Sequence, residues 1–157
     1  MLSFIKRFFI IIIINFIDQS LAGFLSDFLI IIPLTFLTYS FYVYKSYGNI
    51  SALEAFALGL LIDLISDSYF GLNAIIFCLI TYVINLYANA FKLFSYLQIC
   101  LFFGFSSTAY VGFTQLVINL YDFSYLTLFI CSITNIIFCI LIALIPAYFP
   151  KIIRIRI

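Results

Sequence analysis

Long apolar runs separated by short polar turns decide what this chain can fold into. A transmembrane helix needs about 20 mainly apolar residues, and six runs of about that kind follow one another along the 157 residues. Of all residues 67% are hydrophobic and 8% are charged, whereas a soluble domain is about 25% charged. A chain with so little polar surface cannot cover its apolar side chains in water. The sequence therefore predicts an all-α integral membrane protein.

The six runs set the expected domain organisation. The expected transmembrane helices cover residues 2–22, 24–44, 50–65, 70–90, 93–120 and 125–149. The connections between them are short, so residues 1–157 are expected to form a single transmembrane domain, a bundle of six helices. Pro33 lies inside the second run, where it is expected to kink the helix or to lie in the first turn of a shorter one.

The charged residues predict the orientation of the bundle, because cytoplasmic loops are enriched in lysine and arginine. With six spans and a cytoplasmic N-terminus, all 7 basic residues fall on the cytoplasmic side. They are Lys6, Arg7, Lys45, Lys92, Lys151, Arg154 and Arg156, while Asp18, Asp27, Asp67 and Asp122 fall near the opposite side. Adding or removing one span would scatter this pattern. Both termini are therefore expected to be cytoplasmic.

The first run has an alternative interpretation. Basic Lys6 and Arg7, a short apolar stretch and the small-residue sequence Ser20-Leu21-Ala22 also resemble a cleavable signal peptide. We expect the run to be retained as a helix. Asp18 near its outer end is expected to be solvated at the membrane interface.

Asp63 is the most informative residue, because a carboxylate within a membrane span costs at least a few kcal/mol. Gly59, Asp63 and Ser66 share one face of the expected helix 50–65, and small residues let a second helix approach. The two interpretations are a structural hydrogen bond to the fourth or fifth span and a proton or cation site. We favour the first, since the sequence offers no partner for a cation. Because a desolvated carboxyl favours its uncharged form, Asp63→Asn is expected to preserve fold and function.

Small and polar residues also form stripes on the later spans. The further intramembrane candidates are Gly71, Asn73, Tyr82, Asn85, Gly104, Thr108, Gly112, Gln115 and Asn135. Asn73 is placed to cap the fourth helix, although Ser68 competes for that role. Gly104 and Gly112 bracket Thr108 in a pattern that permits close helix contact. The stripes favour packing between helices over a small-molecule pocket.

Residues for catalysis are sparse. The chain has no histidine, which is the commonest general base and metal ligand. Its 4 cysteines lack metal or redox spacing, and no phosphate-binding loop or nucleophile elbow is present. We therefore expect no enzyme activity, metal or cofactor. A net charge of +1 also argues against nucleic-acid binding.

The residues around Asp63 resemble a family motif. Gly59-Leu60 with Asp63, then Gly71 with Ala74, and Tyr82 in the next helix resemble the MreD family of rod-shape-determining membrane proteins. Further matches are Gln19-Ser20 at the end of the first helix, Asp27 before the second, and Asn135 in the last. The chain departs from the family at the turn, where Asp67 and Tyr69 stand for the usual glycine and proline.

The resemblance covers the whole chain and implies a function. It implies a non-enzymatic subunit, in the bacterial inner membrane, of the elongation complex that directs lateral peptidoglycan synthesis. The implied partners are the single-span protein MreC and, indirectly, the actin-like MreB and the wall synthases. The alternative is a vitamin-binding subunit of a transporter, which shares the six-helix arrangement but usually needs longer loops. A proton-coupled carrier would depend on Asp63 alone.

Overall fold

A computed structural model describes residues 2–25, 30–46, 50–66, 69–118 and 124–148, and all regular structure in these ranges is helical. The helices are α1 (Leu2–Leu25), α2 (Leu34–Lys45), α3 (Ala52–Ile65), α4 (Leu72–Leu86), α5 (Ala88–Phe91), α6 (Tyr96–Ile118) and α7 (Tyr125–Tyr148). Three of them contain stretches long and apolar enough to cross a membrane, at Phe8–Leu25, Leu97–Ile118 and Tyr125–Ile142. The expected all-α fold is confirmed.

The expected second span, residues 24–44, is wrong as a continuous helix. Phe24 and Leu25 still belong to α1, residues 30–33 are not helical, and α2 begins only at Leu34. Pro33 occupies the N-cap position of α2 with φ −81° and ψ 79°. Proline lacks an N–H and disfavours a helical conformation in the residue before it, so the helix starts after Pro33. Asp27 lies outside the described residues.

The expected fourth span is also interrupted. α4 ends at Leu86, and the short helix α5 follows after Tyr87. The remaining helices agree with the expected ranges to within about three residues, a common uncertainty at helix ends.

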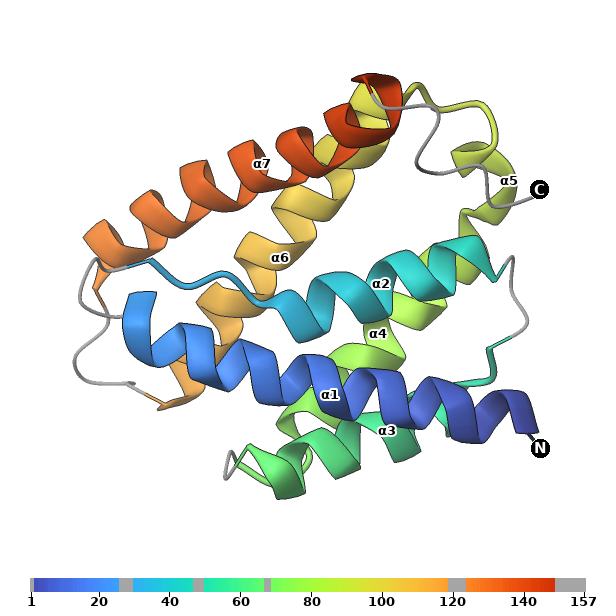
Figure 1. Ribbon diagram of the computed structural model, residues 1–157, viewed down its shortest axis with the longest axis vertical. Helices are drawn as coiled ribbons and strands as arrows, with labels where there is room; N and C mark the ends of the chain where they lie inside the picture. The colour runs from blue at the N-terminus through green and yellow to red at the C-terminus, as the bar shows by residue number, and fades with distance from the viewer. Residues whose placement is uncertain (1, 26–29, 47–49, 67–68, 119–123, 149–157) are drawn as a thin grey trace.

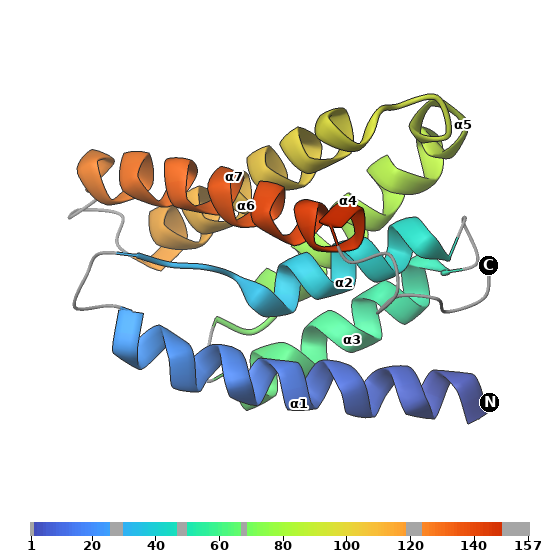
Figure 2. The ribbon, with the colours of Figure 1, turned by 45° about the horizontal axis from the view of Figure 1, so that its top comes forward.

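The long helices alternate in direction (Figures 1 and 2). At one end of the bundle, α1 and α3 finish and α2 and α4 begin; we call it the capping end. At the other, α2 and α4 finish and α6 begins; we call it the aromatic end.

The helices pack in two units. α3 packs against α4, and α6 packs against α7. We call α1–α4 the body and α6–α7 the hairpin; α2 contacts both α4 and α6.

The core is formed by aromatic side chains around α2. The rings of Tyr39 and Phe77 are stacked with centroids 4.1 Å apart, and those of Phe36 and Tyr110 are stacked at 4.7 Å. The Tyr39 hydroxyl shares a 2.6 Å hydrogen bond with the Thr81 hydroxyl, so its polar tip is satisfied where it is buried. α2 is thus held by ring contacts with α4 and with α6.

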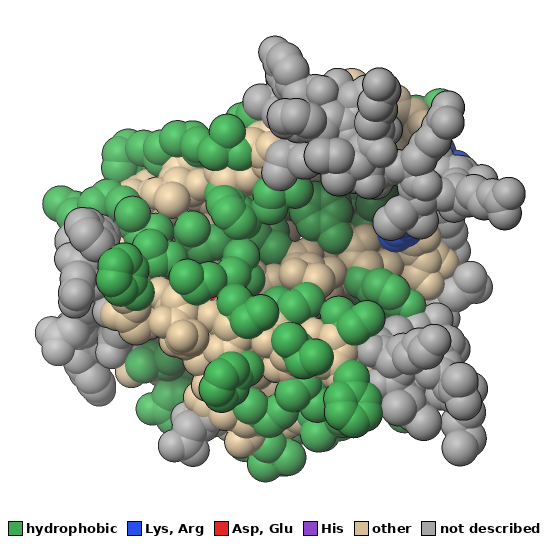
Figure 3. Space-filling model, viewed as in Figure 1, with side chains coloured by type: hydrophobic (Ala, Val, Ile, Leu, Met, Phe, Trp, Pro, Cys, Tyr) green, Lys and Arg blue, Asp and Glu red, His purple; other side chains and the backbone are tan. Residues whose placement is uncertain are grey.

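Large apolar side chains are exposed on α1, α3, α4, α6 and α7. Figure 3 shows hydrophobic side chains spread over the described part of one face, between areas of backbone and other side chains, with lysine or arginine visible only in small patches on the right. Leu53, Phe16 and Phe129 are 78%, 72% and 66% exposed. A soluble monomer rarely exposes apolar patches of this extent, whereas a lipid environment accepts them. The chain is a membrane protein.

Candidate functional site

Asp63, at the end of α3, holds the start of α4. Its carboxylate accepts hydrogen bonds from the backbone N–H groups of Gly71 at 2.9 Å, Asn73 at 3.0 Å and Ala74 at 3.4 Å. The Asn73 side-chain amide donates a further bond at 2.9 Å. The first N–H groups of a helix have no partner within it and carry its positive dipole end. The buried carboxylate therefore caps α4 from a neighbouring helix.

All four of these groups donate hydrogen bonds to Asp63, so the side chain at position 63 must supply acceptors. A carboxylate offers only acceptors, whereas a protonated acid would turn an O–H toward one of the donors. The four bonds use both oxygens of the side chain as acceptors, which does not fit the expectation that asparagine could replace Asp63. Asn73, expected to cap α4 itself, instead donates to the cap. Ser68 lies outside the described residues.

Two glycines bring the first turn of α4 onto Asp63. Gly71 has φ +95°, a left-handed conformation that L side chains rarely adopt. A Cβ atom on Gly59 would lie 2.3 Å from the Ala74 Cα and 2.5 Å from its nitrogen. The backbones of α3 and α4 are thus in direct contact at this level. Any side chain at position 59 would push the donors of α4 away from Asp63.

Asp18 caps α2 in the same way, and the expectation of a solvated interfacial acid is wrong. Its carboxylate accepts from the Leu34 N–H at 3.2 Å, the Thr35 N–H at 2.8 Å and the Thr35 hydroxyl at 2.7 Å. Pro33, the N-cap residue, makes no side-chain cap bond. The cap of α2 is therefore supplied by α1.

Further polar contacts join the helices at the capping end. Asn15 on α1 exchanges hydrogen bonds with Ser66, the C-cap residue of α3, at 3.1 and 3.3 Å. Tyr110 on α6 donates its hydroxyl proton to the Asn73 side-chain oxygen at 2.6 Å. Asp63, Asn73 and Tyr110 therefore form a chain of contacts from α3 through α4 to α6. Sequence reasoning missed Tyr110, because its partner lies 37 residues away.

The glycines of α6 are packed against α7. A Cβ atom on Gly104 would lie 3.0 Å from the Ile136 Cγ1 and 3.2 Å from its Cα, and one on Gly112 would lie 2.8 Å from the Leu128 Cδ1. Thr108 between them donates its hydroxyl proton to the Gly104 carbonyl of its own helix at 2.9 Å. The small-residue stripe of α6 is therefore the contact surface of the hairpin.

The two candidate asparagines outside the cap each bond a backbone carbonyl. The side-chain amide of Asn135 donates to Ile31 at 3.4 Å, and that of Asn85 donates to Ile50 at 3.3 Å. Each leaves a buried side-chain oxygen without a hydrogen bond to the described residues. They hold the segments that precede α2 and α3.

The last two candidates lie away from the cap. Gln115 lines a cavity of about 170 Å³ beside Ile31 and Tyr110. Tyr82 is 67% exposed on α4, so the structure does not bring it into the polar cluster.

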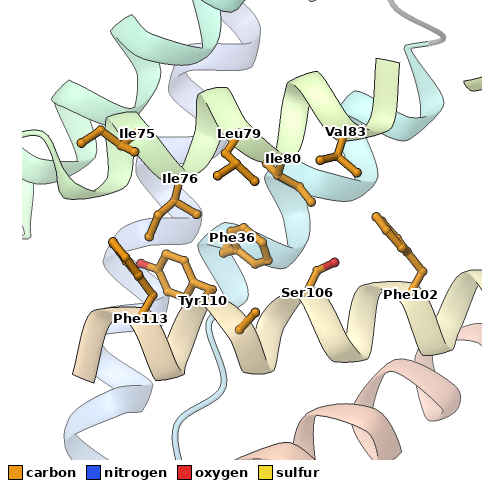
Figure 4. A pocket seen from close by; sticks show the side chains of 11 residues that line it. Phe36, Ile75, Ile76, Leu79, Ile80, Val83, Phe102, Ser106, Tyr110 and Phe113 are labelled. Carbon is orange, nitrogen blue, oxygen red and sulfur yellow. The ribbon is translucent and has the colours of Figure 1, made fainter. Parts of the chain in front are cut away.

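An apolar groove of about 320 Å³ separates α4 from α6. In Figure 4, isoleucine, leucine and valine side chains of α4 face Phe102, Ser106 and Phe113 of α6, with Phe36 between them. No charged side chain lines the groove. No group of three or more histidine, cysteine, aspartate or glutamate residues within the described ranges could hold a metal ion. This geometry suits packing or an apolar occupant.

Comparison with known proteins identifies the family. A family model for the rod shape-determining protein MreD matches residues 2–150. Neither the curated proteins nor the solved structures give a match. The matched region contains all of the described helices, including both carboxylate caps. The chain belongs to the MreD family of rod shape-determining proteins, a family of shape-determining membrane proteins that is not known as an enzyme family.

Proposed function

We propose that the protein is a non-enzymatic, six-pass subunit of the bacterial elongation complex, that it binds an MreC-like single-span protein, and that it helps to direct lateral peptidoglycan synthesis. The family match over residues 2–150 carries this proposal. The caps supplied by Asp18 and Asp63 are consistent with a structural role, because they join α1 to α2 and α3 to α4. MreB-like actin and the wall synthases would be reached indirectly, through the partner.

Segment lengths support six passes through a bilayer core of about 30 Å. The 12 residues of α2 rise about 18 Å as a helix, and residues 30–33 add about 13 Å if fully extended. The 15 residues of α4 rise about 23 Å, and Tyr87 and α5 continue the segment toward the aromatic end. α3, at about 21 Å from its 14 residues, is a short span of the kind that local thinning of the bilayer accommodates.

The positions of the lysines support cytoplasmic termini. Lys45 lies in the last turn of α2 and Lys92 directly follows α5, so both lie at the aromatic end, where α1 starts (Figure 1). Asp18 and Asp63 lie toward the capping end. Because basic residues are enriched on the cytoplasmic side of membrane proteins, the aromatic end would face the cytoplasm, with the protein in the inner membrane.

Cysteine labelling of intact cells tests this orientation. Tyr69→Cys, in the turn before α4, is expected to react with a membrane-impermeant maleimide, because this turn lies at the capping end and Tyr69 is 60% exposed. Ser46→Cys, at the end of α2, is expected to react only after the cells are opened. The unsubstituted chain, with its own cysteines, gives the background. Labelling at position 46 without labelling at 69 would invert the orientation.

The vitamin-binding alternative fits the described pockets less well. Ligand sites combine apolar walls with a few placed polar groups. Among the residues that line the 320 Å³ groove, only Ser106 and Tyr110 have polar side chains. The second cavity, of about 170 Å³, is smaller than ligand pockets usually are. The scaffold function is therefore the better supported of the two.

Depletion separates the two functions in the cell. Removing the protein from a rod-shaped host is expected to give round cells and to leave vitamin uptake intact, and a tagged copy is expected to co-purify with a single-span protein that has an extracytoplasmic domain. The Gly59→Ala variant, which is expected to lose the α3–α4 contact, should fail to restore the rods. Rods that persist after depletion, or a loss of vitamin import, would contradict the scaffold proposal.

A further inference from the structure

The contacts between body and hairpin differ in kind from those within each of them. Within the body, α3 and α4 meet backbone to backbone at Gly59 and Ala74. Within the hairpin, α6 and α7 meet at Gly104 and Gly112. Such small-residue contacts are the tight ones in membranes. α4 and α6, by contrast, are separated by the apolar groove over much of their length (Figure 4).

At the aromatic end, aromatic side chains and the segment between α5 and α6 join the body to the hairpin. Phe103 of α6 stacks on Phe41 of α2 at 4.3 Å and meets Tyr44 edge to face at 5.9 Å. Phe91 of α5 packs against Phe102 at 4.8 Å. Residues 92–95 connect α5 to α6 directly. This end of the groove is therefore closed both covalently and by aromatic packing.

At the capping end, Tyr110 makes the shortest polar link from α6 to the body. Its hydroxyl donates to Asn73 at 2.6 Å, and its ring stacks on Phe36 at 4.7 Å. Two further hydrogen bonds there, each 3.4 Å long, join α7 to Ile31. Ile31 belongs to the non-helical segment before α2. The Tyr110–Asn73 hydrogen bond joins α6 directly to α4 across the mouth of the groove.

We propose that the hairpin is a movable element that pivots at the aromatic end, and that the Tyr110–Asn73 hydrogen bond is the latch that holds the surface groove between α4 and α6 at its present width. Because Asn73 also donates to Asp63, the latch is connected to the cap of α4. Opening would break the Tyr110–Asn73 hydrogen bond and the Tyr110–Phe36 ring contact, would stretch or break the two 3.4 Å bonds to Ile31, and would leave the α3–α4 and α6–α7 contacts intact. The groove would then widen sideways between α4 and α6.

The test uses a reporter cysteine inside the groove of the full-length protein. Ser106→Cys is nearly isosteric and places a thiol on the groove wall. Its rate of reaction with a lipid-permeant maleimide is measured at that position by peptide mass spectrometry, so that the native cysteines do not interfere. Adding Tyr110→Phe, which keeps the ring and removes the hydroxyl, is expected to raise the rate roughly threefold, the factor that corresponds to an average hydrogen bond between membrane helices.

Tyr39→Phe is the matched control. It removes a hydroxyl whose hydrogen bond is also 2.6 Å long but lies within the body, between α2 and α4. The rate at position 106 is expected to stay unchanged in this variant. An unchanged rate in Tyr110→Phe would overturn the latch. An equal rise in both variants would also overturn it, since it would show general loosening of the core.

Discussion

Gly59→Ala is expected to disrupt the packing of α3 on α4 and to lower the amount of folded protein in the membrane sharply. The added methyl group would lie 2.3 Å from the Ala74 Cα and 2.8 Å from the Asn73 carbonyl carbon. Both are backbone atoms, so no side chain can rotate away and the two helices must separate. Overpacking of a core typically costs about 1–3 kcal/mol, and a shift of two backbones is expected to exceed that range. Gly59→Leu should do still more harm.

The other glycines of the chain provide a graded control series for this prediction. Gly104→Ala meets the Ile136 backbone at 3.2 Å and should destabilise moderately, whereas Gly112→Ala meets only the flexible end of Leu128 and should destabilise less. A methyl group on Gly23 would meet nothing within 4 Å, so Gly23→Ala should behave as wild type. The measurements are the amount of membrane-inserted protein and the unfolding temperature in detergent. Equal stability of the Gly59 and Gly23 variants would contradict the backbone contact.

The importance of Gly59 and Asp63 could be predicted from the sequence, because the two residues lie one helical turn apart in the same helix. A glycine one helical turn before an acid predicts from sequence alone that a second helix approaches closely there, and the structure has this contact between α3 and α4. The long apolar runs likewise predicted an all-helical membrane protein. These features need only the period of a helix and the cost of a charge in lipid.

The roles of Asp18 and Tyr110 could not be found in this way. Asp18 caps a helix that begins 16 residues later in the chain, and Tyr110 bonds a residue 37 positions away. Pro33 left two possibilities open, a kinked long helix or a shorter one, and the apolar residues on both sides of it did not decide that α2 starts at Leu34. A cap supplied by another helix has no sequence pattern of its own, since donor and acceptor meet only after the helices pack.

Asp63→Asn is expected to destabilise the protein, which reverses what the sequence suggested. An amide supplies one acceptor oxygen, and its NH₂ group would face N–H donors where the carboxylate now offers its second oxygen. A buried donor left without a partner costs about 1–3 kcal/mol. Asp63→Leu removes both acceptors from the Gly71, Asn73 and Ala74 N–H groups and should be worse.

Glu54→Gln is the control for the change from acid to amide on the same helix. Glu54 is half-buried in the first turn of α3, where the loss of its charge should cost less than about 1 kcal/mol. Asp18→Asn, at the cap of α2, should resemble Asp63→Asn. Unfolding temperatures and the amounts of inserted protein give the order of stability, and cell shape in a depleted host gives function. If Asp63→Asn were as stable as wild type and kept cells rod-shaped, the cap of α4 would not need the second carboxylate oxygen. If it were stable but left cells round, the ionisable proton itself would be required, and capping would not explain the residue.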